Sequence, residues 1–189
     1  MFFSDFKQDG RQVIGEIEEV LNSINPDQAQ KFINLFDKAV ARKIVVAGAG
    51  RMGYAAKGFA MRLGHMGFTA WMIGDSTVPH IGVGDLLIVA SGSGNTQTIY
   101  DVALKAHQNG ADIALVTNNP DSRIGLLSTT IVKIENKNNK LTKTRTSKQP
   151  MSTLNEQCLS LFFDTCVLGI MRKNDETHES MWARHSNLE

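Results

Sequence analysis

The sequence predicts an α/β protein of the doubly wound, flavodoxin-like kind, with a five-stranded parallel sheet flanked by helices. Five short apolar segments have the length of buried strands, and segments of helical length separate them. Glycine-rich turns follow two of these strands and lead into helices. Strands that alternate with helices in this way form right-handed crossovers, which build a parallel sheet. The expected strands are 43–47, 68–73, 86–90, 113–117 and 130–134.

The helices at both ends of the chain are expected additions to one domain that spans residues 1–189. Two amphipathic helices occupy about 1–40, and Asn25-Pro26 opens the second because proline is favoured at the first helical position. After Pro150 a strongly apolar helix runs from residue 152 to about 171, and a polar helix covers about 176–186. The C-terminal helices therefore occupy about 152–186.

The segment Glu135 to Gln149 is dominated by charges and amides and is expected to form a solvated loop. It is either a linker or a place where a lysine such as Lys148 approaches a phosphorylated ligand. The two cysteines, Cys158 and Cys166, lie eight residues apart in one expected helix. A rise of 1.5 Å per residue separates them by ~12 Å, too far for a disulfide, so both are expected to be buried thiols.

The composition excludes several classes of function. A length of 189 residues, 42% hydrophobic residues and 21% charged residues are typical of one soluble globular domain. The net charge of +1 gives no electrostatic reason to expect a nucleic acid or an anionic membrane as partner. No apolar run approaches the ~18 residues of a membrane span, and the N-terminus lacks the features of a signal peptide. The expected location is the cytoplasm.

The loop Ser91-Gly-Ser-Gly-Asn-Thr96 carries the clearest functional signal. It joins a buried strand to a helix, and it offers two glycines, three hydroxyls and the positive end of a helix dipole. This combination suits a phosphate group. Without a lysine the loop is not a nucleotide P-loop, so a single phosphate monoester is the better fit. The alternative is a tight turn in which Thr96 only caps the helix.

A second glycine-rich loop, Gly48-Ala-Gly-Arg-Met-Gly53, also joins a strand to a helix. This context matches a dinucleotide-binding fingerprint, with Asp75 as a candidate for the ribose-binding acid, so an NAD-dependent oxidoreductase is one possible interpretation. Loops at the carboxyl ends of neighbouring parallel strands line one crevice. Two such loops would hold opposite ends of one small anion, which favours a sugar phosphate over NAD.

These loops resemble those of the sugar isomerase (SIS) domain family. More narrowly, six further segments are similar to the 6-phospho-3-hexuloisomerase family: Phe59-Ala-Met-Arg-Leu63, Gly84-Asp85, Asn119-Pro-Asp-Ser122, Gln149-Pro-Met151, Glu156-Gln157 and Arg184 to Glu189. The resemblance implies conversion of arabino-3-hexulose 6-phosphate to fructose 6-phosphate in the ribulose monophosphate pathway of formaldehyde assimilation or detoxification. It also implies a homotetramer with active sites near subunit contacts, and no metal or organic cofactor.

The resemblance assigns substrate binding to residues of both loops. Met52 stands where the family usually has a serine, and Asn95 where it has a glutamate. Since Met52 cannot hydrogen-bond a sugar hydroxyl, contacts from the first loop are expected from Arg51 and backbone groups. SIS domains also serve in regulators, so a non-catalytic sugar-phosphate sensor and another phosphosugar isomerase are the alternatives. The substrate-binding residues implied are Gly50, Arg51, Ser91, Gly92, Ser93, Asn95 and Thr96.

Isomerisation needs a base that takes a proton from one carbon and returns it to the next. Glu156, in the first turn of the apolar helix, is the candidate base, although Thr153-Leu-Asn-Glu156 also matches a capping box in which the glutamate only satisfies a backbone N–H. Histidine is the common acid–base residue of enzymes that work near neutral pH, so His185 is the second catalytic candidate, for ring opening or oxygen protonation. Its alternative is a solvated, frayed C-terminus.

The apolar helix also suggests an oligomer. Large apolar residues occur at almost every turn of this helix. A single sheet face is expected to bury only a stripe of them, so the remaining residues are expected to contact a second copy of the chain. The residues on which this depends are Leu159, Phe162, Phe163, Val167 and Ile170.

Overall fold

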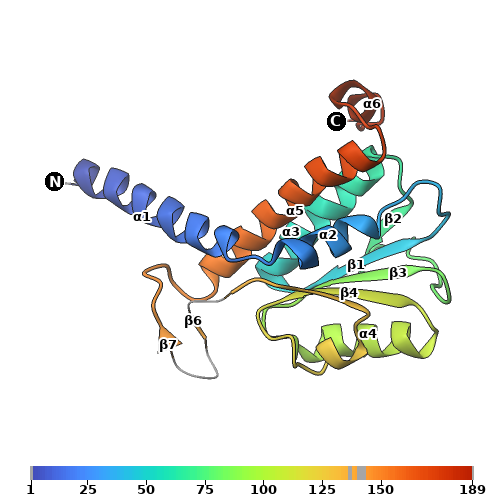
Figure 1. Ribbon diagram of the computed structural model, residues 1–189, viewed down its shortest axis with the longest axis horizontal. Helices are drawn as coiled ribbons and strands as arrows, with labels where there is room; N and C mark the ends of the chain where they lie inside the picture. The colour runs from blue at the N-terminus through green and yellow to red at the C-terminus, as the bar shows by residue number, and fades with distance from the viewer. Residues whose placement is uncertain (1, 136–137, 140–143, 189) are drawn as a thin grey trace.

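The computed structural model describes residues 2–135, 138–139 and 144–188, and side chains within 5–135 and 146–188. Five parallel strands form one sheet in the order β2-β1-β3-β4-β5 (Figure 1). This is the flavodoxin-like order, so the predicted fold class is confirmed. The strands are β1 (Ile44–Gly48), β2 (Ala70–Met72), β3 (Leu86–Ala90), β4 (Asp112–Thr117) and β5 (Thr130–Lys133).

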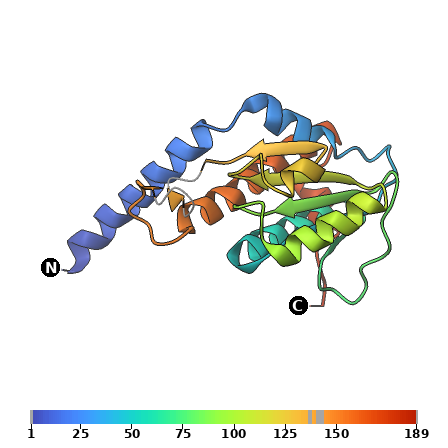
Figure 2. The same cartoon turned by 90° about the horizontal axis from the view of Figure 1, so that it is seen from below.

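Helices cover both faces of the sheet, as Figures 1 and 2 show. The helices α2, α3 and α5 lie on one face and α1 packs along α5, whereas α4 and the short 3₁₀ helix η1 lie on the other. The helices are α1 (Phe2–Asn22), α2 (Pro26–Asn34), α3 (Gly50–His65), α4 (Gln97–Gln108), η1 (Gly125–Leu127), α5 (Thr153–Lys173) and α6 (His178–Trp182). The last is shorter than predicted, since only five residues near the C-terminus are helical.

The central strands explain why the sheet needs two layers of helices. Val46 of β1 and Ile88 of β3 face α3 and α5, whereas Val45 and Leu87 face α4. All five residues of β3 are buried, as a strand covered on both faces requires.

Phenylalanine rings pack α5 tightly against α3. The rings of Phe59 on α3 and Phe163 on α5 stack with centroids 4.4 Å apart and planes only 8° from parallel. Phe32 of α2 packs on both, at 6.0 Å and 6.2 Å. Burial of such rings is among the largest single contributions to a core. It fixes the middle turns of α3 and α5 relative to each other.

The apolar stripe on α5 is buried inside the chain, so the prediction that its residues need a second copy is wrong. The helices α1, α2 and α3 together cover it, because they wrap more of the α5 circumference than one sheet face would. Leu161 and Leu168 are the large apolar side chains of α5 that stay exposed, at 39% and 56%. The buried residues are Leu159, Phe162, Phe163, Val167 and Ile170.

The polar segment before α5 is also more ordered than predicted. Asn138–Asn139 (β6) and Thr144–Arg145 (β7) pair as antiparallel strands, while residues 136–137 and 140–143 lie outside the described residues. Ser147 and Gln149 are buried, so the prediction of a solvated loop is wrong for this part. The approach of Lys148 to a ligand stays a prediction.

Glu16 of α1 is the reason for that burial. Its carboxylate accepts hydrogen bonds from the Ser147 hydroxyl at 2.6 Å, the Lys148 backbone N–H at 3.0 Å and the Gln149 side-chain amide at 3.1 Å. Burial alone would raise the pKa of Glu16, but these bonds and a fourth from Gln12 outweigh it and lower the pKa from 4.5 to about 2. Glu16 therefore ties α1 to the segment that leads into α5.

We expect this carboxylate to make the protein sensitive to acid. Because the folded-state pKa of Glu16 lies below the unfolded value, its contribution to stability is complete above pH 4.5 and is lost as pH falls toward 2. The shift corresponds to about 3 kcal/mol. Urea unfolding of the wild type and Glu16→Gln across this range should show a shallower pH dependence in the variant. Equal slopes would argue against the assignment.

The two cysteines lie in the core of the domain. Cys158 and Cys166 are both buried and free, as predicted, and burial raises the pKa of their thiols to about 11 and about 12. Among the described residues, no helix combines the length and the apolar character that crossing a membrane would require.

Candidate active site

The candidate site lies where the strand order reverses, between β1 and β3. Gly48 at the end of β1 pairs with Ala90 at the end of β3, so the two glycine-rich loops begin at the same level of the sheet. The helices that follow, α3 and α4, leave toward opposite faces. Both helix N-termini thus lie at one crevice, the usual position of an anionic ligand in an open parallel sheet.

The loop of residues 91–96, which we name the phosphate cradle, offers backbone N–H groups as hydrogen-bond donors to a ligand. No hydrogen bond within the described part of the chain uses the backbone N–H of Gly92, Ser93, Thr96 or Gln97. Thr96 is the N-cap residue of α4, but its side chain makes no capping hydrogen bond. Its hydroxyl lies 3.5 Å from that of buried Ser91. Orphan N–H groups and nearby hydroxyls are the donors that a phosphate accepts from.

A neighbouring loop, residues 118–124, holds the cradle in place through hydrogen bonds. The Ile124 backbone N–H donates to the Gly94 carbonyl at 3.1 Å, and the Asn119 side-chain amide donates to the Ser93 carbonyl at 3.2 Å. Asn95 takes part in the same network: its oxygen accepts from the Arg123 N–H and its nitrogen donates to the Ser93 carbonyl. The Asn95 side chain, predicted to bind substrate, holds the loop in shape in this structure.

The first loop depends on a close backbone approach. A Cβ on Gly53 would lie 2.7 Å from the Gly48 carbonyl oxygen, so only glycine allows α3 to start this close to β1. Gly50 has φ +57°, a left-handed conformation that glycine adopts without strain. Asp75, the candidate ribose ligand of the NAD interpretation, accepts a hydrogen bond from the Met72 backbone instead.

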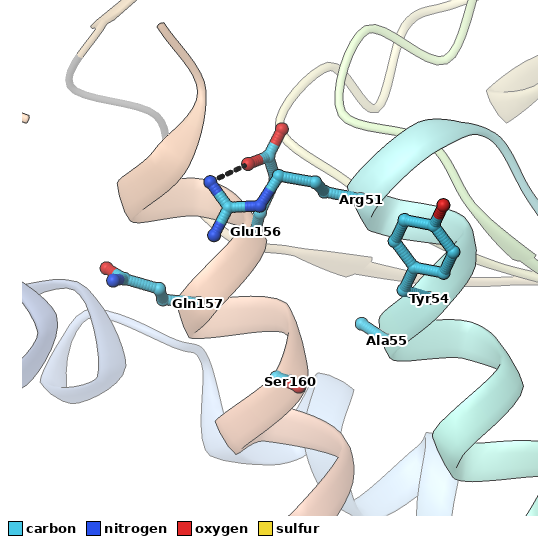
Figure 3. Close-up of a pocket in the computed structure, with 6 residues that line it drawn as sticks. All are labelled: Arg51, Tyr54, Ala55, Glu156, Gln157 and Ser160. Carbon is cyan, nitrogen blue, oxygen red and sulfur yellow. Dashed lines mark ion pairs between the residues drawn. The ribbon is translucent and has the colours of Figure 1, made fainter. Parts of the chain in front are cut away.

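Arg51 joins the first loop to α5. One of its guanidinium nitrogens lies 3.0 Å from Oε2 of Glu156 and donates to the Thr153 hydroxyl at 3.2 Å (Figure 3). The Glu156 side chain is 18% exposed and that of Arg51 is 56% exposed, so the pair stands at the mouth of the site. The N-cap residue of α5 is Ser152, and the Glu156 backbone N–H donates to the Ser152 carbonyl, so the alternative of a capping box between Thr153 and Glu156 does not form.

The ion pair borders a pocket of about 300 Å³ between the N-terminal halves of α3 and α5. The sequence did not single out Tyr54, Gln157 or Ser160, which also line it. Helical spacing was the available signal for Tyr54 and Ser160, three and four positions from Arg51 and Glu156, whereas Gln157 has no such signal. The lining residues, labelled in Figure 3, are Arg51, Tyr54, Ala55, Glu156, Gln157 and Ser160.

His185 lies away from this pocket within the chain. Its ring packs on that of His65, at the last residue of α3, with centroids 5.1 Å apart. Arg51 is in the first turn of the same helix, so the helical rise separates the two ends by about 20 Å. The chain brings Glu156 to the two loops and leaves His185 at the far end. A catalytic role for His185 therefore requires the site of another subunit.

No group of three or more histidine, cysteine, aspartate or glutamate side chains within the described residues is placed to bind a metal ion. The donors gathered at the crevice are N–H groups, hydroxyls and one guanidinium, which match phosphate and sugar oxygens. A doubly wound sheet with this crevice and an adjacent carboxylate–guanidinium pair defines an α/β protein that binds a phosphorylated small molecule.

The chain belongs to the SIS domain family, whose model matches residues 39–161. It is 38% identical over 182 residues to the 3-hexulose-6-phosphate isomerase of Bacillus subtilis, covering 92% of this chain and 97% of that one. The 3-hexulose-6-phosphate isomerase of Mycobacterium gastri is 36% identical over 180 residues, covering 92% and 86%.

A solved structure from Methanococcus jannaschii has the same architecture. It superimposes with a TM-score of 0.81 at 28% identity, covering 96% of this chain and 99% of the other, and a 3-hexulose-6-phosphate isomerase function was inferred for it. The resemblance drawn from the sequence is therefore confirmed.

Proposed function

We propose that this protein is a 3-hexulose-6-phosphate isomerase, which converts the 3-ketose phosphate to fructose 6-phosphate. The observation that carries the proposal is the position of Glu156, paired with Arg51 at 3.0 Å beside a phosphate cradle. A carboxylate next to a phosphate site is the minimum that moving a carbonyl between neighbouring carbons of a phosphosugar requires. Named isomerases similar over most of the chain support the same substrate class. Since the substrate is a charged metabolite made inside cells, action in the cytoplasm is part of the proposal.

In the mechanism we propose, the cradle binds the phosphate and Glu156 moves the proton. The carboxylate removes the proton from C2, and the electron pair forms the C2–C3 double bond of an enediolate while the C3 carbonyl becomes an oxyanion. The carboxylic acid then returns the proton to C3, and the C2 hydroxyl proton passes to the C3 oxyanion, which leaves a carbonyl at C2 and a hydroxyl at C3. We assign stabilisation of the oxyanion to Arg51, because its guanidinium pairs with Glu156 and its side chain is more than half exposed.

The direct test supplies 3-hexulose 6-phosphate to the purified chain, made in place by hexulose-phosphate synthase from ribulose 5-phosphate and formaldehyde. We expect fructose 6-phosphate to appear, measured by a coupled assay. Binding of phosphosugars without turnover would instead favour a sensor. No fructose 6-phosphate from an otherwise folded protein would overturn the proposal.

The cradle makes a separate prediction for Ser93. Ser93→Ala should remove one hydrogen bond to a charged phosphate, worth about 1.5–3 kcal/mol, and raise the Michaelis constant roughly ten-fold or more. Ser23→Ala is a matched control, because that hydroxyl bonds the Val20 carbonyl at the end of α1. Equal Michaelis constants for wild type and Ser93→Ala would contradict a phosphate contact at Ser93.

We also propose that the chain assembles as a homotetramer, with His185 reaching the site of a neighbouring copy. The α1 helix extends beyond the body of the domain (Figures 1 and 2), and it leaves Phe6 and Ile14 exposed at 78% and 65%. Leu168 of α5 adds a further exposed apolar side chain. Apolar side chains on these long helices are a natural surface for a second copy.

Light scattering at micromolar concentration should therefore give about four times the chain mass of 20.8 kDa. Leu168→Glu should shift the protein toward smaller species, because it places a charge in the proposed contact. Val83→Glu is the control, since Val83 is 89% exposed in the loop before β3. A wild-type monomer would refute the assembly and any role for His185 in a neighbouring site.

A further inference from the structure

Asn155 is buried next to Glu156 and has an unmatched hydrogen-bond acceptor. The side chain is only 2% exposed, and its Oδ1 has no partner among the described residues. The other end of the amide makes one long bond, from Nδ2 to the Ile134 carbonyl at 3.5 Å. An unsatisfied buried amide oxygen destabilises a fold, so its retention beside a site calls for a ligand or a functional partner.

The unmatched oxygen points at the phosphate cradle. Asn155 Oδ1 lies 3.1 Å from the position that a Cβ on Gly92 would occupy. Asn118 Nδ2 lies 3.4 Å from the same position, so an acceptor and a donor approach the cradle backbone together. The end of the Met52 side chain, Cε, lies 3.2 Å from it and covers the spot from the first loop.

Met52 explains why an acceptor is needed here. A methionine at this position of the first loop offers no hydrogen bond to a sugar hydroxyl. Its unbranched side chain is only partly buried and has three rotatable bonds, so its end can move aside at small cost. Gln157, on the other side of Glu156, carries a second buried oxygen without a partner within the described residues. Gln157 points away from Glu156 (Figure 3), so Asn155 is the one of the two whose unmatched acceptor lies at the cradle, and a sugar supplies donor hydroxyls.

We propose that Asn155 is a substrate-binding residue whose Oδ1 accepts a hydrogen bond from a hydroxyl of the phosphosugar, reached when the end of Met52 moves away. The inference rests on the proposed function. It adds a hydrogen bond to a hydroxyl of the sugar rather than to its phosphate. Since Asn155 precedes Glu156 on α5, this contact holds the sugar chain next to the carboxylate. The phosphate stays in the cradle, where backbone N–H groups bind it.

The test replaces Asn155 by leucine, which keeps the volume and removes the amide. We expect the Michaelis constant for 3-hexulose 6-phosphate to rise about five- to ten-fold. Calorimetry should show a similar loss for fructose 6-phosphate and an unchanged affinity for inorganic phosphate. The melting temperature should stay the same or rise, because the unsatisfied oxygen is gone.

Asn174→Leu at the other end of α5 is the matched control. That amide is satisfied, since it donates to the Phe36 and Ile170 carbonyls and accepts from the Lys38 N–H. The control should melt at a lower temperature and keep its Michaelis constant. The opposite profile for Asn155→Leu, less stable with phosphate affinity lost equally, would overturn the inference and make Asn155 a support of the cradle.

The same measurements separate this inference from the proposed function. If the wild type binds fructose 6-phosphate but does not form it, the isomerase proposal fails, and the calorimetric comparison of the sugar phosphate with phosphate still decides the role of Asn155. If the wild type is active and Asn155→Leu keeps the wild-type Michaelis constant, the inference alone fails. A wild type that binds phosphate with no added affinity for the phosphosugar overturns both.

Discussion

Glu156→Gln is expected to lower the turnover rate by about 10²–10⁴ with little change in the Michaelis constant or the melting temperature. Glutamine keeps the shape of the side chain and can still accept a hydrogen bond from Arg51, which lies 3.0 Å from Oε2 in the wild type. It cannot take a proton from carbon. The effect should therefore fall on the chemical step, measured by steady-state kinetics with the coupled assay.

Ser160→Ala is the control, because Ser160 lines the same pocket one turn along α5 and makes no ion pair with Arg51. Its turnover should stay close to that of the wild type. Exchange of the carbon-bound substrate proton with solvent gives an independent measurement of the proposed step. A Glu156→Gln enzyme that exchanges this proton at the wild-type rate would exclude Glu156 as the base.

Glu156 also illustrates what local sequence can and cannot establish. The sequence pattern left a capping box open, because a glutamate three residues after a threonine satisfies that pattern wherever it lies. In the structure the Thr153 hydroxyl instead accepts a hydrogen bond from Arg51, 102 residues away in the sequence, so the capping box does not form and the role of Glu156 as the base stays a proposal. Such a long-range contact has no local signature.

The fold itself was predictable because its signals are local. The five residues of β3 form an unbroken apolar run, and the glycines that follow permit the close turns into α4. The cradle was predictable for the same reason, since residues 91–96 are contiguous. Their donors lie together whatever the rest of the chain does.

The failures share one cause, which is burial by a distant element. The polar segment before α5 has the composition of a solvated loop, but Glu16 lies 131 residues from Ser147 and buries it through a hydrogen-bond network. The apolar residues of α5 beyond those that one sheet face buries were expected to contact a second copy, because periodicity shows how much surface must be covered and not what covers it. In the structure, α1, α2 and α3 cover it.

The second large effect is expected at Gly94. A Cβ there would lie 1.9 Å from Oγ and 2.5 Å from Cβ of buried Ser122, and φ is +63°, so alanine meets both a collision and left-handed strain. The Ser122 hydroxyl can rotate, but its Cβ can move only with its backbone. Overpacking and strain together should cost about 2–4 kcal/mol and lower the melting temperature by roughly 5–15 °C.

The collision also affects substrate binding, because Gly94 is one of the residues through which loop 118–124 contacts the cradle: its carbonyl accepts from the Ile124 N–H. Displacing it should misalign the N–H groups of Gly92 and Ser93 and raise the Michaelis constant by at least ten-fold. Gly58→Ala is the matched control: this glycine is inside α3 with open space at its Cβ, so alanine should leave kinetics unchanged and increase stability by about 0.5–1 kcal/mol. Wild-type melting and kinetics in Gly94→Ala would show that the cradle does not depend on this close approach.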